Sequence, residues 1–276
     1  MDWNRKSPLI EEIYTESKTG RQENNEDAIY QGTHFVAVID GATSKTKAVL
    51  DGKTGGQLCA QQIMDTIHDL DENITGEAAV SQIYMDLKEM AKLRGLEQKG
   101  IHCCASAVIF SCARREIWAI GDCQYMIDGQ HYTNSKSIDR IMSEARVAAI
   151  YMLLQKGITE EQLLQHDHSR EIIFPLLQEQ KYLENSKAPY GYPVFNCHTQ
   201  PDFIIQKVPD RCRIVLASDG YPFLRESLAE SERELSELLK EDPLCYKKYC
   251  STKGLQAGNI SFDDRSYIRF SLGEFK

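Results

Sequence analysis

The sequence has no apolar run long enough to cross a bilayer, and its first residues lack the apolar block and cleavage site of a secretory signal. It also lacks a basic stretch with interleaved aromatic residues. Its 32 lysines and arginines are outnumbered by 41 aspartates and glutamates, so the formal net charge is −9. A chain this acidic repels a nucleic-acid backbone. The sequence therefore predicts a cytoplasmic protein that binds neither membranes nor nucleic acids.

The cysteines lack any regular pattern. There are nine of them, an odd number, and no Cys-x-x-Cys pair occurs. Disulfide frameworks and structural zinc sites both need regular spacing, so we expect reduced thiols. Internal repeats and proline- or serine-rich linkers are also lacking. With 276 residues, 42% hydrophobic and 26% charged, the chain is expected to form a single globular domain over residues 1–276.

Short apolar runs rich in β-branched residues predict the strands. They occur at residues 35–39, in two predicted hairpins of 105–110 with 115–120 and 203–208 with 212–217, and at 266–272. Apolar residues at helical spacing predict helices at 60–70, 79–91, 138–154, 171–182 and 226–239. Neighbouring hairpin strands favour antiparallel pairing, so we expect an α+β fold with helices packed outside the sheets.

Carboxylates gather at the ends of these predicted strands. Asp40, Asp122 and Asp219 each come at or just after the end of a strand, and Asp263-Asp264 precedes the last one. Any single Asp-Gly pair is explained by turn formation. Two carboxylates about 4 Å apart, however, repel by about 1 to 4 kcal/mol depending on the effective dielectric. Several that converge need protons or cations among them, so the set predicts a site for divalent cations.

Five short motifs give this set a recognisable order: NNEDA at 24–28, VIDG at 38–41, GDC at 121–123, ASDG at 217–220 and DDRS at 263–266. In these motifs the sequence resembles the type 2C, or PPM, family of metal-dependent serine/threonine protein phosphatases. They follow the family's order and span nearly the whole chain. The resemblance implies a four-layer α-β-β-α sandwich of two mainly antiparallel sheets with helices on both outer faces.

The resemblance also implies a role for each motif residue. Asp40 would bridge two metal ions, with the Gly41 carbonyl oxygen, Asp219 and Asp263 as the other protein ligands. Glu26 would bind the second metal through water and Asp27 would support that shell, while Asp122 would help to hold a third metal. These predicted metal and catalytic residues are Asp40, Gly41, Asp219, Asp263, Asp122, Glu26 and Asp27. All of the donor atoms are oxygens, which suits Mg²⁺ or Mn²⁺.

The sequence departs from the family pattern in several places. The family's phosphate-binding arginine corresponds to Arg21, which lies one residue further from Glu26 than usual; a plain surface cation is the alternative. Ala42 stands where some members have a histidine proposed as general acid. Cys123 replaces a serine, and a small buried thiol explains it better than a nucleophile. The usual asparagine after the last ligand is Asp264, which would either add charge to the metal shell or cap a turn.

The resemblance implies a phosphomonoester hydrolase that dephosphorylates phosphoserine or phosphothreonine in proteins. Two alternatives stay open. One is a non-catalytic binding or scaffold domain, and the other is a phosphatase for a small phosphate ester. The segment at about 138–200 takes the place of the family's variable flap, where we expect substrate choice to be made. The sequence leaves the oligomeric state open.

Overall fold

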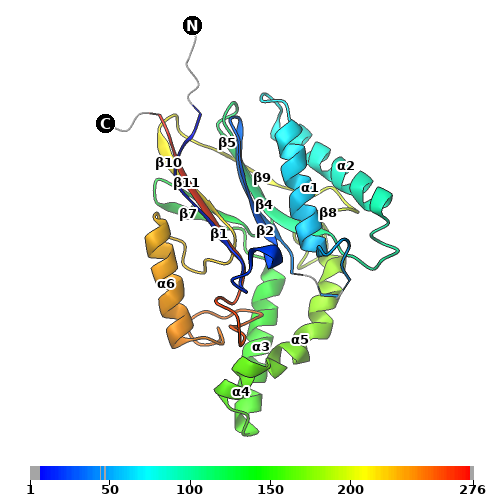
Figure 1. Cartoon of the computed structure of the whole chain (residues 1–276), viewed down its shortest axis with the longest axis vertical. Coiled ribbons are helices and arrows are strands. Elements are labelled where there is room, and N and C mark those ends of the chain that lie inside the picture. The colour runs from blue at the N-terminus through cyan, green and yellow to red at the C-terminus, as the bar shows by residue number, and fades with distance from the viewer. Residues whose placement is uncertain (1–6, 44, 47, 274–276) are drawn as a thin grey trace.

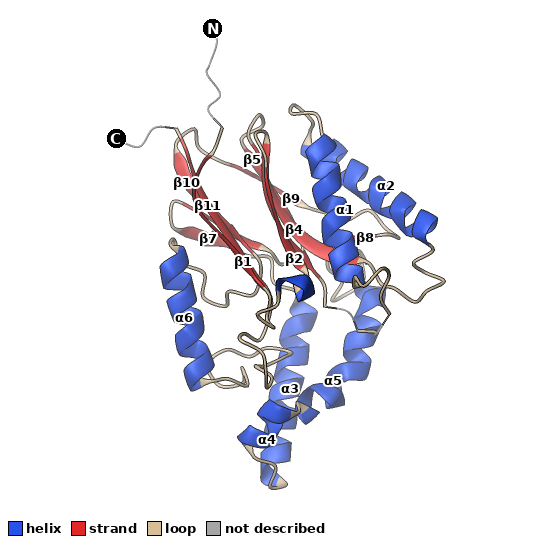
Figure 2. Cartoon of the chain, in the orientation of Figure 1, coloured by secondary structure: helices blue, strands red, loops and turns tan. Residues whose placement is uncertain are grey.

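The computed structural model describes residues 7–43, 45–46 and 48–273. Two antiparallel sheets lie face to face at its centre, with helices on both outer faces (Figures 1 and 2). The first sheet has the order β1-β11-β10-β6-β7. Its strands are β1 (Leu9–Glu16), β11 (Arg265–Leu272), β10 (Cys212–Ala217), β6 (Gln124–Ile127) and β7 (Gln130–Tyr132). The expected α-β-β-α fold is confirmed.

The second sheet has the order β2-β3-β4-β5-β9, and one short strand, β8, pairs with β4 beside it. Its strands are β2 (Asp27–Gln31), β3 (Phe35–Gly41), β4 (Cys104–Ser111), β5 (Glu116–Ile120), β9 (Ile204–Lys207) and β8 (Phe195–Asn196). The predicted strand at 35–39, the hairpin of 105–110 with 115–120 and the last strand are therefore present.

One predicted pairing is wrong. Residues 203–208 and 212–217 form strands, but not a hairpin, because β9 pairs with β5 and β10 pairs with β6 and β11 in the other sheet. The intervening loop crosses between the sheets. The burial of each strand explains the separation. β9 is mostly exposed at a sheet edge, whereas the apolar residues of β10 are buried on both faces and need neighbours on both sides.

The helices fall into three groups. Helices α1 (Gly55–Asp69) and α2 (Gly76–Arg94) cover the second sheet, and α6 (Leu228–Glu241) covers the first (Figure 2). The third group lies beyond one end of the sheets and belongs to the segment expected to act as a flap (Figure 1). It comprises α3 (Ser137–Gln155), α4 (Glu160–Gln165), α5 (His168–Glu179) and the 3₁₀ turn η2 (Gln180–Leu183); a second such turn, η1 (Gln22–Asn24), precedes β2. No helix in the described ranges is long and apolar enough to span a membrane.

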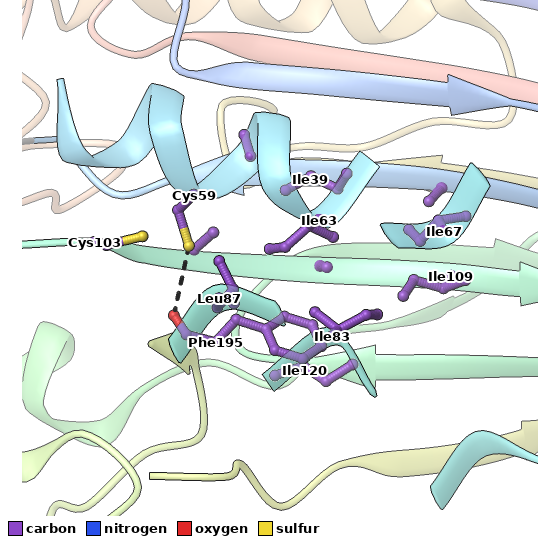
Figure 3. Packing of buried hydrophobic residues seen from close by; sticks show 14 of the residues in the cluster. Ile39, Cys59, Ile63, Ile67, Ile83, Leu87, Cys103, Ile109, Ile120 and Phe195 are labelled. Carbon is purple, nitrogen blue, oxygen red and sulfur yellow. Dashed lines mark hydrogen bonds between the residues drawn. The ribbon is translucent and has the colours of Figure 1, made fainter. Parts of the chain in front are cut away.

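Strand β3 is buried on both faces, which explains its unbroken apolar sequence. Phe35, Ala37 and Ile39 pack under α1 and α2, in one core cluster with Ile63 and Ile83 (Figure 3). Val36 and Val38 face the other way, into the core between the two sheets. Side chains alternate along a strand, so Asp40 falls on the inter-sheet face. The strand thus delivers a carboxylate to the end of the space between the sheets.

A buried arginine joins two parts of the helical segment to each other and fastens them to the loop after α6. Arg146 of α3 is fully buried and donates two hydrogen bonds to Asp167 Oδ2, from Nε at 3.1 Å and from a terminal nitrogen at 2.8 Å. Its other terminal nitrogen donates to the carbonyls of Leu244 and Ser251. A guanidinium suits this role because its donors have a fixed planar geometry.

Replacing Arg146 with methionine removes this cation and leaves Asp167 buried without its countercharge. We expect Arg146→Met to lower the free energy of unfolding by about 3 to 5 kcal/mol, measured by urea denaturation. Arg140→Met, which breaks an exposed pair with Glu144 on the same helix, should cost less than about 1 kcal/mol. Equal effects of the two substitutions would contradict this role for Arg146.

Candidate active site

A cavity of about 1110 Å³ opens at the end of the two sheets, between them and the helical segment. Its wall includes Asp40, Asp122, Asp219 and Asp263. These residues come from the end of β3, the turn after β5, the turn after β10 and the turn before β11. Four segments that are far apart in the sequence therefore bring their carboxylates to one place.

Asp27 lies beside Asp40 but does not line the cavity. The two residues are direct partners in the antiparallel pairing of β2 and β3. Asp27 is 8% exposed, and its Oδ2 atom is buried with no hydrogen-bond partner in the part of the chain that the structure describes. A buried carboxylate oxygen without a donor is costly. Because Asp27 lies beside Asp40, this oxygen is available to a proton or a cation that neutralises the carboxylates.

The carboxylates shift one another's pKa values. Burial raises the pKa of Asp40 well above its ordinary value, and the charges of Asp27, Asp122 and Asp263 raise it further. Burial and the charges of Asp40, Asp263 and Asp122 do the same to Asp219. Burial, aided by the charges of Asp264 and Asp263, raises the pKa of Asp27 to about 8. Without added cations the site therefore retains protons at neutral pH.

Three lysines supply part of the missing positive charge. Lys136 lies 2.8 Å from Asp122 Oδ2, Lys253 pairs with Asp263 Oδ2, and Lys18 lies 3.1 Å from Asp264 Oδ2. Although burial opposes ionisation, Lys136 lowers the pKa of Asp122, and Lys253 with Lys18 lowers that of Asp263. The sequence analysis missed these lysines because nothing in their local sequence marks them.

Asp264 organises the loop that carries Glu26. One oxygen accepts a hydrogen bond from the Lys18 backbone at 2.8 Å, and the other accepts one from the Glu26 backbone at 3.2 Å. Glu26 itself is 5% exposed, and its Oε1 accepts a hydrogen bond from the Thr54 hydroxyl at 2.6 Å. Thr54 is the N-cap of α1. Glu26 therefore lies outside the cavity wall, held between a helix terminus and Asp264.

Gly41 follows Asp40 where two backbone segments come close. A Cβ atom at this position would lie 2.5 Å from the Glu26 carbonyl oxygen and 2.6 Å from that of Gly56. Only glycine fits such a gap. The Gly41 nitrogen donates a hydrogen bond to the Glu26 carbonyl at 3.1 Å, which ties the Asp-Gly turn to the NNEDA motif.

The structure places the predicted phosphate-binding residue, Arg21, outside the cavity wall and other cations within it. Arg21 is exposed and does not line the cavity, whereas Lys45 of the loop after Asp40 and Arg170 of α5 do. Burial and the nearby charge of Arg170 lower the pKa of Lys45, and neither cation forms an ion pair within the described ranges. Cys123 is 2% exposed and burial raises its pKa, which fits the expected inert thiol.

The donor atoms fit hard divalent cations. The proposed ligand side chains are all carboxylates. The mutual repulsion of Asp40, Asp219 and Asp263 favours a bound cation. The Oδ2 atom of Asp27, which has no hydrogen-bond partner in the described part of the chain, favours one too. Oxygen-only sites suit Mg²⁺ or Mn²⁺. A cation bound to Asp263 or Asp122 would compete with the ammonium group of Lys253 or Lys136 for the carboxylate.

Comparisons with known proteins agree with this fold. The family model described as "Protein phosphatase 2C" matches residues 16–243, so the chain belongs to that family. The catalytic domain of the serine/threonine phosphatase PstP, solved with two manganese ions, is 14% identical with a TM-score of 0.50, and the match covers 97% of this chain and 100% of that one. The Mycobacterium tuberculosis phosphatase PstP/Ppp is 16% identical with a TM-score of 0.51, and the match covers 96% and 100%. No curated protein is similar enough in sequence to count as a match.

The raised pKa of Asp27 predicts an unusual pH dependence for the metal-free protein. Between pH 4 and pH 8 the folded state holds a proton on Asp27 that the unfolded state has lost, so this group's contribution to stability falls as pH rises. Asp27→Asn should remove a slope of up to about 1.4 kcal/mol per pH unit, measured by denaturation in EDTA. Asp65→Asn, an exposed carboxylate on α1, should leave the slope unchanged. The same slope in the Asp27 variant would contradict the assignment.

Proposed function

We propose that this protein is a metal-dependent phosphomonoester hydrolase that acts on phosphoserine and phosphothreonine in proteins. The observation that carries the proposal is the convergence of Asp40, Asp122, Asp219 and Asp263 on one cavity of a protein phosphatase 2C fold. A scaffold domain without activity would not need to keep Asp40 and Asp219 buried among other carboxylates, since this burial raises their pKa values and lowers the stability of the folded chain at neutral pH.

We assign the metal ligands on the family resemblance and the position of each residue. Asp40 would bridge two ions, with the Gly41 carbonyl, Asp219 and Asp263 completing the protein ligands. Glu26 would bind the second ion through water and Asp27 would support that shell, both from outside the cavity wall, and Asp122 would help Asp219 to hold a third ion. The PstP domain named above contains two manganese ions, which supports Mg²⁺ or Mn²⁺ as the cofactor.

When bound, two such ions activate a water and neutralise charge on the phosphoryl oxygens. The chain's own residues must hold the phosphate and exclude alternative geometries. Arg21 is the residue that the resemblance proposes for phosphate binding. Lys45 and Arg170 are a second proposal, because both line the cavity and neither forms a salt bridge with a carboxylate within the described ranges. Ala42, not a histidine, follows Gly41, so the general acid proposed for some family members is lacking at that position.

The cavity accommodates a phosphorylated side chain on a peptide, and its wall of residues 136–199 keeps a small phosphate ester as the second candidate substrate. Its volume of about 1110 Å³ exceeds what a small ester fills. Residues 136–199 of the helical segment supply much of its wall, which supports substrate choice by this flap. We further propose that the whole chain forms one catalytic domain, and that its nine free thiols reflect a reducing, cytoplasmic location.

The proposed activity predicts hydrolysis of p-nitrophenyl phosphate and of a phosphothreonine peptide that depends on Mn²⁺ or Mg²⁺ and stops in EDTA. Asp219→Asn should lower kcat/KM by at least about 100-fold, because it removes a ligand of the ions that stabilise the transition state. Asp65→Asn is the matched control and should retain full activity. Failure of the folded wild-type protein to release phosphate with either metal would overturn the enzyme proposal and favour a scaffold.

The two proposals for phosphate binding predict different variants. A charged hydrogen bond to phosphate is worth about 1.5 to 3 kcal/mol, so the residue that makes it should lower kcat/KM by about 10- to 100-fold when replaced by alanine. If the side chains of Lys45 and Arg170 bind the phosphate, Lys45→Ala and Arg170→Ala should show this loss. Arg21→Ala should then change kcat/KM less than about twofold. The opposite ranking would assign the role to Arg21. Steady-state kinetics with the phosphothreonine peptide makes the comparison.

A further inference from the structure

A second group of metal-ligating side chains lies in the wall of the same cavity, away from the four aspartates. His102 precedes β4, Cys104 is the first residue of β4, and Glu184 follows η2. One nitrogen, one sulfur and one oxygen from these residues all lie within 4.8 Å of one another. All three residues line the cavity. The three donors therefore share one small volume that is open to ligands from the cavity.

The electrostatics of this group call for a cation. The side chain of Glu184 is 5% exposed, and its Oε1 lies 2.7 Å from His102 Nε2. Its Oε2 accepts a hydrogen bond from the Asn196 amide at 2.9 Å. No lysine or arginine pairs with Glu184 in the portion of the chain that the structure describes. A buried carboxylate with only an imidazole and an amide as partners lacks a permanent countercharge.

The donor types select the kind of cation. Imidazole nitrogen, thiolate sulfur and carboxylate oxygen together suit zinc, whereas Mg²⁺ and Mn²⁺ prefer oxygen alone. At zinc bond lengths, tetrahedral nitrogen and oxygen ligands lie about 3.3 Å apart, so the His102–Glu184 contact must widen by about 0.6 Å, and the Cys104 sulfur must come to about 3.5 Å from each of them. His102 has room for this movement because its side chain is 34% exposed. The Asn196 hydrogen bond already fixes the orientation of the Glu184 carboxylate, as groups around metal ligands commonly do.

We propose that His102, Cys104 and Glu184 form a binding site for a zinc-class divalent cation, with a fourth position open to the cavity. Three protein ligands and one open position is the arrangement of zinc sites that bind water or a substrate group. The site adjoins the candidate active site through the backbone, because the Cys104 carbonyl accepts a hydrogen bond from the Ala42 nitrogen at 2.9 Å. Ser106, two residues along β4, is the strand partner of Asp40 and donates to Asp122 at 2.6 Å.

A second cluster of ligand-type side chains does not meet the same conditions. His166, His168 and Glu171 lie within the same distance of one another, but all three are exposed. Both histidines already share the Glu171 carboxylate, at 2.7 and 3.0 Å. Exposed groups of this kind are satisfied by water and by one another, so burial and access to the cavity distinguish the His102 site.

Cobalt is the probe, because a thiolate bound to Co²⁺ gives a charge-transfer absorption that oxygen ligands do not. The full-length protein, stripped of metal and then saturated with Mg²⁺ to fill the acidic cluster, is titrated with Co²⁺. We expect the thiolate band in the wild type and in Asp219→Asn, and its loss on addition of Zn²⁺. Absence of the band from the wild-type protein would overturn the proposal and leave Cys104 as an apolar packing residue.

Matched variants assign the band to the proposed residues. Cys104→Ser should abolish it, whereas Cys103→Ser, at the adjacent buried cysteine, should retain it. A band that persists in the first variant or vanishes only in the second would contradict the assignment. His102→Ala and Glu184→Gln keep every thiol and should weaken Co²⁺ binding by at least about tenfold. Unchanged affinity in these two variants would likewise overturn the site, even if Cys104→Ser failed to fold.

Discussion

The repulsion among buried carboxylates is the constraint on which the rest of the structure depends. Asp40, Asp219 and Asp27 hold raised pKa values because they are buried together, while Asp122 and Asp263 remain ionised beside lysines. Such an arrangement lowers the stability of the folded chain unless protons, ammonium groups or metal ions are present. The fold must therefore supply enough apolar burial elsewhere to keep these groups together.

The sandwich meets that requirement with cores on both sides of the second sheet. Strand β3 is apolar on both faces, so the position of Asp40 at its end is fixed by packing against α1 and α2 on one side and against the other sheet on the other. Hydrogen bonds then fix the loops around Asp40. Thr54 caps α1 and also donates to Glu26, and Asp264 holds the Lys18 and Glu26 backbones.

Much of this could be predicted from the sequence, because the decisive signals are local. A buried apolar run that ends in Asp-Gly marks both a strand and a turn, and this is how the positions of Asp40 and Asp219 were found. Pairing between distant segments leaves no such mark, so β9 and β10 were wrongly joined into a hairpin. Strand β1 was missed because the adjacent Glu11 and Glu12, at the irregularity in its pairing with β11, interrupt the alternation of apolar and polar residues.

Contacts between side chains that are distant in the sequence also could not be predicted from local sequence patterns. Lys18, Lys136 and Lys253 reach the carboxylates from three separate segments, and only the folded chain brings them there. The same holds for Glu184, which joins His102 and Cys104 from a distant turn. Arg21 shows the converse, since a residue chosen by its place in a motif lies exposed outside the cavity wall.

The lysines make the central claim directly testable, because a metal ion and an ammonium group of like charge compete for the same carboxylate. The decisive measurement is anomalous diffraction from crystals of the protein soaked with Mn²⁺. The account predicts two manganese peaks about 3.5 to 4 Å apart beside Asp40, with Lys253 displaced from Asp263. No manganese peak in the acidic cluster, with Lys136 and Lys253 still paired to their carboxylates, would contradict it.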